Sequence, residues 1–79
     1  MATGWVNDLD KLRVRNRIKE LRFAHGEMTQ QGLATAVGCS RQTIVLLEQG
    51  RYSPSLTLAF LIARHFDKTV DAVFEFIDE

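Results

Sequence analysis

The sequence predicts an all-α bundle of short helices, and three observations support this fold class. Several segments have apolar residues at the spacing of one helix face. Each of these segments follows a residue that commonly caps a helix, and the caps are Thr29, Ser40, Ser55 and Thr69. The connections are short, and Gly38 and Gly50 stand where two of the helices should stop.

The helices are expected in a single domain over residues 12–79, after an N-terminal arm over residues 1–11 that has no clear period. The first helix should run from about Asn16 to near His25-Gly26. The others are expected over 30–37, 41–49, 56–66 and from 70 to about 76. Their apolar positions form the predicted core: Ile18, Leu21, Leu33, Ala34, Val37, Ile44, Leu47, Leu58, Ile62, Phe66, Val70 and Val73.

Two short segments at the ends of the domain alternate in the manner of strands. Residues 12–17 place leucine and valine on one side and three arginines on the other, and residues 74–78 interleave Phe74, Phe76 and Ile77 with acids. The acidic segment 75–78 could pair with the basic segment 13–17, within or between chains, with opposite charges facing each other. The alternative is that the tail is only the frayed end of the fifth helix.

Composition excludes several classes of protein. The chain is 46% hydrophobic and 25% charged, as in a folded globular domain, and its longest apolar run, 58–63, is too short to cross a membrane. With one cysteine, Cys39, and no sign of a signal peptide, we expect a cytoplasmic protein with a buried, inert thiol. His25 and His65 lack partners at ligand spacing, and no catalytic grouping or cofactor motif is present. We therefore expect no metal, no cofactor, no small-molecule ligand and no enzymatic activity.

The charge is unevenly distributed although the net charge is zero. Residues 11–51 contain eight Lys or Arg and three acids, a local charge of +5. Residues 52–79 contain two bases and five acids, a local charge of −3. A basic portion of this kind can bind phosphate while the whole chain stays neutral, although an ordinary solvated charge distribution would look the same.

Residues 29–50 predict a helix-turn-helix, because two short helices are joined by the tight connection Gly38-Cys39-Ser40. With Ile44 and Leu47 facing inward, the second helix should point Gln42, Val45, Leu46 and Gln49 outward and expose Arg41 at its first turn. Arginine can pair with guanine, glutamine with adenine, and threonine or an aliphatic group with the thymine methyl. The alternative is a solvated polar helix end, which leaves the outward valine and leucine unexplained.

The stretch from Arg22 to Phe74 resembles the Cro/repressor-type helix-turn-helix regulators, in particular their short single-domain members. The resemblance rests on many positions in order, among them Met28-Thr29-Gln30-Gln31, Leu33-Ala34, Val37-Gly38, Ser40 to Ile44, Leu47-Glu48 and Gly50 to Leu56. It implies a five-helix, lambda-repressor-like domain that binds double-stranded DNA. Gly32 departs from the family, which usually has glutamate there, and Leu61 stands where a charged residue is common.

The resemblance also implies roles for individual residues. The residues that it implies for reading bases are Arg41, Gln42, Thr43 and Leu46. Phosphate contacts fall to Gln30, Arg51 and Tyr52, and Ser40, which should cap the reading helix, is expected at the phosphate as well. Arg22 and Glu48 match a partly buried ion pair between the first and third helices, which would make Arg22 structural rather than DNA-binding.

The fourth helix is apolar on nearly every side, so part of it should meet another subunit. We expect a two-fold homodimer through this helix and the tail, with Phe60, Leu61, Phe74 and Phe76 at the interface. The leading interpretation is a transcriptional regulator, more specifically a repressor, that reads a short palindrome in the major groove. The alternative is a protein-interaction module on the same fold, such as an antitoxin or anti-regulator.

Overall fold

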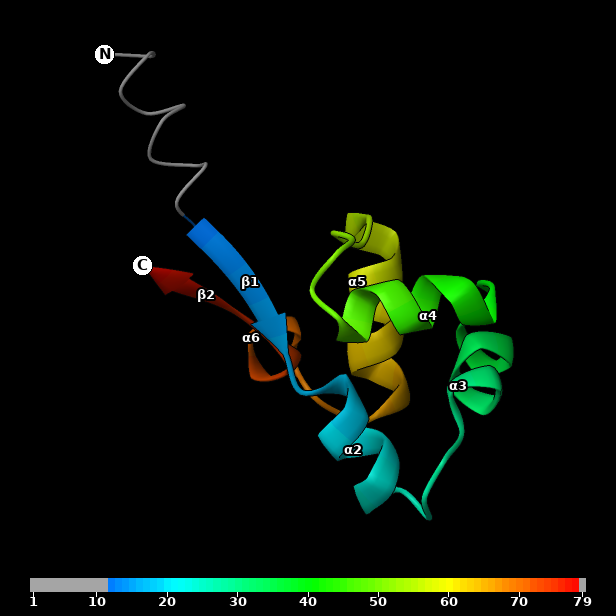
Figure 1. Ribbon diagram of the computed structural model, residues 1–79. Helices are drawn as coiled ribbons and strands as arrows, with labels where there is room; N and C mark the ends of the chain where they lie inside the picture. Colours follow the sequence, from blue (N-terminus) through cyan, green and yellow to red (C-terminus); the bar gives the residue numbers. More distant parts are fainter. Residues whose placement is uncertain (1–11, 79) are drawn as a thin grey trace.

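The structure, a computed structural model, describes residues 12–78 and consists of five helices and one two-stranded sheet (Figure 1). The order is β1 (Leu12–Asn16), α2 (Ile18–Ala24), α3 (Gln30–Val37), α4 (Arg41–Glu48), α5 (Leu56–His65), α6 (Val70–Val73) and β2 (Phe74–Asp78). The predicted all-α class with short terminal strands is therefore confirmed. The proposed arm, residues 1–11, lies outside the described residues.

The helix boundaries follow from local capping. The side-chain oxygens of Thr29, Ser40 and Ser55 accept hydrogen bonds from the backbone N–H three residues later, at 2.9–3.1 Å. Each bond satisfies one of the free N–H groups at the start of a helix. At the other end of α3, Gly38 adopts a left-handed conformation with φ of 80°, which a residue with a Cβ atom rarely adopts. The predicted limits of α3 are those observed.

The fifth helix is shorter than expected, and this corrects the prediction that it runs to about Phe76. The helix α6 ends at Val73, and the backbone of Phe74 is already extended, with φ of −119° and ψ of 142°. Thr69 occupies the cap position but makes no side-chain capping bond. The chain leaves the helix here because β2 pairs with β1 along its length, which gives backbone groups partners that a frayed helix end would lack.

The strands β1 and β2 pair antiparallel within one chain, with Val14 opposite Phe76 and Arg15 opposite Glu75. The pairing of the basic and acidic segments is thus confirmed, and the frayed-helix alternative is wrong. Arg15 Nε donates to Glu75 Oε1 at 2.6 Å, and Arg17 donates to the same oxygen at 3.4 Å. These ion pairs lower the pKa of the Glu75 carboxyl, the hydrogen bond from Arg15 being the main cause.

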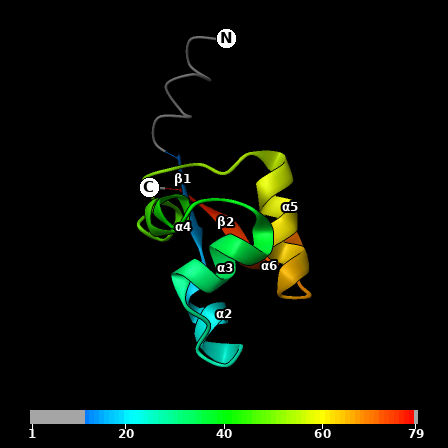
Figure 2. The same ribbon diagram turned by 90° about the vertical axis from the view of Figure 1, so that its right-hand side faces the viewer.

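The core lies between the helices, and the sheet closes one side of it. The helix α4 packs against β1 and against α3, and α3 also packs against α5, which stands beside α4 in Figure 1 (Figure 2 gives the view turned by 90°). Twelve apolar residues are buried: Ile18, Leu33, Ala34, Val37, Ile44, Leu47, Ala59, Ile62, Ala63, Phe66, Val73 and Phe74. The predicted Leu21, Leu58 and Val70 are partly buried against them. Ala59, Ala63 and Phe74 belong to the core although they were not predicted there.

Candidate nucleic-acid interface

The first turn of α4 presents polar side chains to solvent at the surface of the protein. Arg41 and Gln42 are exposed, and Thr43 is half-buried. The hydroxyl of Ser40 accepts a hydrogen bond from the backbone N–H of Thr43 at 3.1 Å, and the two hydroxyl oxygens lie 2.9 Å apart. Ser40 is therefore the cap of this helix, and its hydroxyl also orients the side chain of Thr43.

The inner face of α4 is fixed by the core. Ile44 and Leu47 are 0% and 1% exposed, which holds the opposite face of the helix outward. Gln42 and Gln49 lie on the exposed side, as expected. Val45 and Leu46, which were also expected to point outward, are half-buried and not exposed. Leu46 therefore offers an apolar edge next to the exposed polar turn.

The connection between α3 and α4 is a tight turn stabilised by backbone hydrogen bonds. The N–H groups of Gly38 and Cys39 both donate to the carbonyl of Ala34, at 2.9 and 3.0 Å. Cys39 is half-buried and packs against the core, and burial raises the pKa of its thiol. The thiol is therefore less buried than the sequence predicted, and the raised pKa favours its protonated form.

A buried polar network joins α2, α3 and α4. Arg22 donates to both carboxylate oxygens of Glu48, at 2.6 and 3.0 Å, and to the carbonyl of Met28 at 2.7 Å. The two side chains are 7% and 8% exposed, so the expected ion pair is present and more deeply buried than expected. The side-chain amide of Gln30 also donates to Glu48, at 3.1 Å. Glu48 thereby holds Gln30, a predicted phosphate contact, at the start of α3.

The loop after α4 brings two further predicted phosphate contacts to the surface. Arg51 and Tyr52 are both exposed, and Tyr52 is 47% exposed. The backbone N–H groups of Gly50 and Arg51 donate to the carbonyls of Leu47 and Leu46, at 3.0 and 2.9 Å, which folds the loop back onto α4. The chain thus presents Arg51 at one end of the reading helix and Arg41 at the other.

The side chain of Asn16, which was not predicted to have a role in the site, joins β1 to α4. Its amide nitrogen donates to the carbonyl of Leu47 at 2.8 Å, and its amide oxygen accepts from the backbone N–H of Ile18 at 3.1 Å. Asparagine before a helix is a recognisable cap signal. The partner of the amide nitrogen, however, lies 31 residues away, and no local pattern could have indicated it.

The positive charge is less widely available than the sequence suggested. Arg15 and Arg17 pair with Glu75, and Arg22 pairs with Glu48. Within residues 12–78, no ion pair is found for Arg41 or Arg51. The arginines at the two ends of α4 therefore have no acidic partner among the described residues, and phosphate or base edges could meet them.

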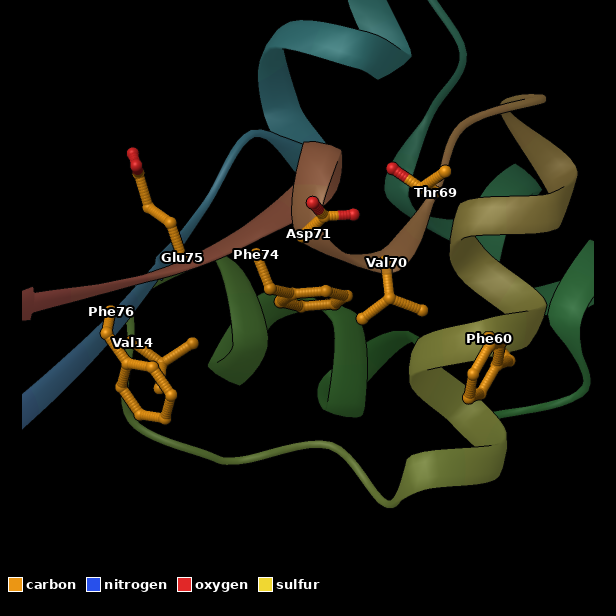
Figure 3. A pocket seen from close by; sticks show the side chains of 8 residues that line it. All are labelled: Val14, Phe60, Thr69, Val70, Asp71, Phe74, Glu75 and Phe76. Atoms are coloured by element: carbon orange, nitrogen blue, oxygen red, sulfur yellow. The ribbon is translucent and has the colours of Figure 1, made fainter.

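A separate apolar groove lies between α5, α6 and the sheet, with a volume of about 710 Å³ (Figure 3). It is lined by Val14, Phe60, Thr69, Val70, Asp71, Phe74, Glu75 and Phe76. Phe60 and Phe76 are 57% and 72% exposed, and Leu61 is 41% exposed. The predicted interface residue Phe74 differs from these, since it is 9% exposed and part of the core. Little of its side chain is therefore exposed in the groove.

Within the described chain, no group of three or more His, Cys, Asp or Glu residues is placed to hold a metal ion. No described helix is long and apolar enough to cross a membrane.

Two short helices joined by a tight turn, with the second presenting a capped polar end outward, define a helix-turn-helix DNA-binding domain. The Helix-turn-helix family model matches residues 18–73, more than half of the chain. The chain therefore belongs to the helix-turn-helix family, as a short DNA-binding regulator of transcription and not an enzyme.

Relatives and a solved structure agree with this assignment. Over 66 residues the chain is 52% identical to an uncharacterized HTH-type transcriptional regulator of Archaeoglobus fulgidus, covering 84% of this chain and 93% of the relative. It is 41% identical over 61 residues to the uncharacterized HTH-type transcriptional regulator YgzD of Bacillus subtilis, covering 77% and 91%. The crystal structure of a Bacteroides fragilis protein assigned as DNA-binding has a TM-score of 0.67 at 26% identity, covering 78% and 98%.

Proposed function

We propose that this protein is a sequence-specific repressor that binds a short palindromic operator as a homodimer. The observation that carries the proposal is the first turn of α4, where Arg41 and Gln42 are exposed on a helix whose other face is locked into the core. Such a turn can enter the major groove, where arginine and glutamine distinguish guanine and adenine.

In this proposal one set of side chains around α4 reads bases and another set contacts phosphates. Arg41, Gln42, Thr43 and Leu46 read base edges, with Leu46 meeting a thymine methyl. Contacts to the phosphate backbone come from Gln30, Ser40, Arg51 and Tyr52. The hydrogen bond from Gln30 to Glu48 supports this division, because it holds the glutamine at the helix start without using all its donors.

The dimer is proposed to form through the apolar groove and the adjoining face of α5, with residues 12–79 as the folded unit. Phe60, Leu61 and Phe76 are exposed apolar side chains, and a second copy would remove them from water. Phe74 would contribute the edge of its ring from the floor of the groove. Two-fold symmetry would then place two α4 helices on successive half-sites of one face of DNA.

The proposal is tested by selecting bound duplexes from a random pool and measuring their affinity against salt. We expect one enriched sequence with two-fold symmetry, and an affinity whose logarithm falls steeply with the logarithm of salt concentration. A selected pool with no common sequence would contradict specific readout, and an enriched but asymmetric site would contradict the palindrome.

A second candidate function is an interaction module that captures a protein through the apolar groove. The exposed Phe60 and Phe76 favour it, since no described residue covers them. The same selection separates the two functions. A chain that binds duplexes without preference, and whose groove binds a different protein, would support the interaction module.

A further inference from the structure

The end of α4 is tied to the rest of the protein by a side chain that lies outside the helix-turn-helix. The amide nitrogen of Asn16 donates to the carbonyl oxygen of Leu47 at 2.8 Å in a partly buried position, and its amide oxygen accepts from the N–H of Ile18 at 3.1 Å. Only one orientation of the amide satisfies both contacts, because the first partner accepts and the second donates. Asn16 therefore joins three elements: its backbone is in β1, its oxygen accepts from the first N–H of α2, and its nitrogen holds α4.

The carbonyl that Asn16 holds is one of the last four of α4, and besides Asn16 it accepts a hydrogen bond from the backbone N–H of Gly50, at 3.0 Å, in the loop that follows the helix. The side chains of Ile44 and Leu47 set how deeply α4 sits in the core, but apolar contacts are not directional. A hydrogen bond to the backbone is directional, so it fixes the tilt and rotation of this end of the helix. The ion pair of Glu48 with Arg22 ties the same end of α4 to α2, so Asn16 adds a second, separate polar contact from β1.

The tilt of α4 matters at its other end. A helix of this length spans about 12 Å. When the helix tilts about its end at Leu47, the first turn moves by that length multiplied by the tilt angle in radians. Base readout requires the reading side chains to stay within about 0.5 Å of their productive positions. Non-specific contacts to phosphates tolerate larger displacements, since they depend mainly on charge.

From this geometry we infer that Asn16 is a positioning residue that orients the reading helix, so that its hydrogen bond to Leu47 contributes to sequence discrimination. The inference rests on the proposed function, because it requires that α4 read bases. It assigns part of the sequence specificity to a strand residue that itself contacts no base.

Two substitutions remove the contact to α4 while leaving an acceptor for α2. Asn16→Asp is isosteric and keeps the oxygen that accepts from Ile18, but it has no donor for the Leu47 carbonyl. Asn16→Ser is uncharged and keeps a hydroxyl near the start of α2, but it is too short to reach α4. An effect common to both variants therefore comes from the lost donor and not from the added charge. Arg15→Gln is the matched control, since it removes a side-chain contact from the same strand without touching α4.

The experiment measures the affinities of each variant for the selected duplex and for a scrambled duplex at the same salt concentration. We expect the ratio of the two affinities to fall about tenfold in Asn16→Asp and Asn16→Ser. A loss of this size lies within the range of discrimination that one good base contact supplies. The helical circular dichroism and the salt dependence on scrambled duplex should stay unchanged in Asn16→Ser. Arg15→Gln should keep the wild-type ratio. A mutation that only destabilised the fold would lower both affinities in the same proportion.

A wild-type ratio in both folded Asn16 variants would overturn the inference while leaving specific DNA binding intact. A wild-type chain with no preference between the duplexes would overturn the proposed function, and the inference with it. If both variants fail to fold, the scalar coupling across the hydrogen bond from Asn16 to the Leu47 carbonyl is measured in the wild-type protein bound to each duplex. The coupling should be present on the selected duplex, and its absence there would overturn the inference.

Discussion

The guanidinium of Arg22 finds its polar partners inside the protein, two on Glu48 and one on the backbone of Met28. Burying two charges is costly unless their hydrogen bonds are satisfied, and here they are. No buried side-chain polar atom of the described residues is left without a partner. The pair therefore fixes how α2 and α4 meet, and it withdraws one arginine from the surface that could bind phosphate.

Replacing Glu48 with Gln should destabilise the fold strongly, because Arg22 would remain buried without a compensating charge. We expect the free energy of unfolding to fall by about 3 kcal/mol, measured by urea denaturation. Glu20→Gln, at an exposed position of α2, is the control and should change it by less than about 0.5 kcal/mol. Equal effects of the two substitutions would show that the buried pair has no special role.

Gln42 and Arg51 should differ in how they contribute to DNA binding. Gln42→Ala should weaken the selected duplex by about 1–3 kcal/mol and leave scrambled duplex nearly unchanged, because a base contact is lost. Arg51→Ala should weaken both duplexes alike and reduce the salt slope by about one, because a phosphate contact is lost. Fluorescence anisotropy titrations over a range of salt concentrations measure both quantities. Equal losses on both duplexes for both variants would refute this division of roles.

Among the secondary-structure elements, the sheet shows how charge and apolar surface are separated along one strand. In Figure 3 the side chains of Phe74 and Phe76 point to one side of β2, and that of Glu75 points to the other. One side of the ladder therefore carries the ion pairs with Arg15 and Arg17, and the other forms part of the apolar groove. Arg17 also donates to the carbonyl of Ala72, which joins the start of α2 to the end of α6.

The lowered pKa of Glu75 predicts a dependence of stability on pH. Because the folded pKa lies below that of the unfolded chain, the stabilisation is present above the unfolded value and is lost as pH falls through the folded value. Wild type and Glu75→Gln should therefore differ most near neutral pH. Thermal melts between about pH 6 and pH 3 should show the difference shrinking as the carboxyl protonates. A difference that grows toward acid would contradict the assignment.

In the folded chain, the two ends of the domain pair and form a surface that neither end has alone. Val14 of β1 and Phe76 of β2 are cross-strand neighbours, and Phe60 of α5 lines the same groove. A groove of this apolar character is common where a second subunit binds. The proposed dimer thus depends on the pairing of the chain ends.

Phe60→Glu and Phe76→Glu should prevent dimerisation, because each places a charge in an apolar contact. We expect light scattering at tens of micromolar to report a dimer for wild type and a monomer for both variants. Affinity for the palindrome should fall while the fold is kept. Phe23→Glu, at an apolar side chain that is 53% exposed on α2 and outside the groove, should remain dimeric. A monomeric wild type at this concentration would overturn the proposed dimer.

The amino-acid sequence was sufficient for the features that depend on neighbouring residues. Caps such as Ser40 and stops such as Gly38 act within one turn of a helix, so α3 was predicted with its observed limits and α4 within one residue. The apolar period identified the buried face of α4 for the same reason, because Ile44 and Leu47 lie three residues apart on one helix face.

Contacts between distant residues decided the rest. The tail could have been a helix end or a strand, and pairing with β1, some sixty residues away in the chain, made it a strand. The same pairing takes Arg15 and Arg17 out of the free positive charge and builds the apolar groove. Asn16 reaches the carbonyl of Leu47 only after β1 and α4 have packed together. The alternating charges indicated that the two ends could pair, but which backbone and side-chain groups come within hydrogen-bonding distance depends on the whole fold, and local pattern does not determine it.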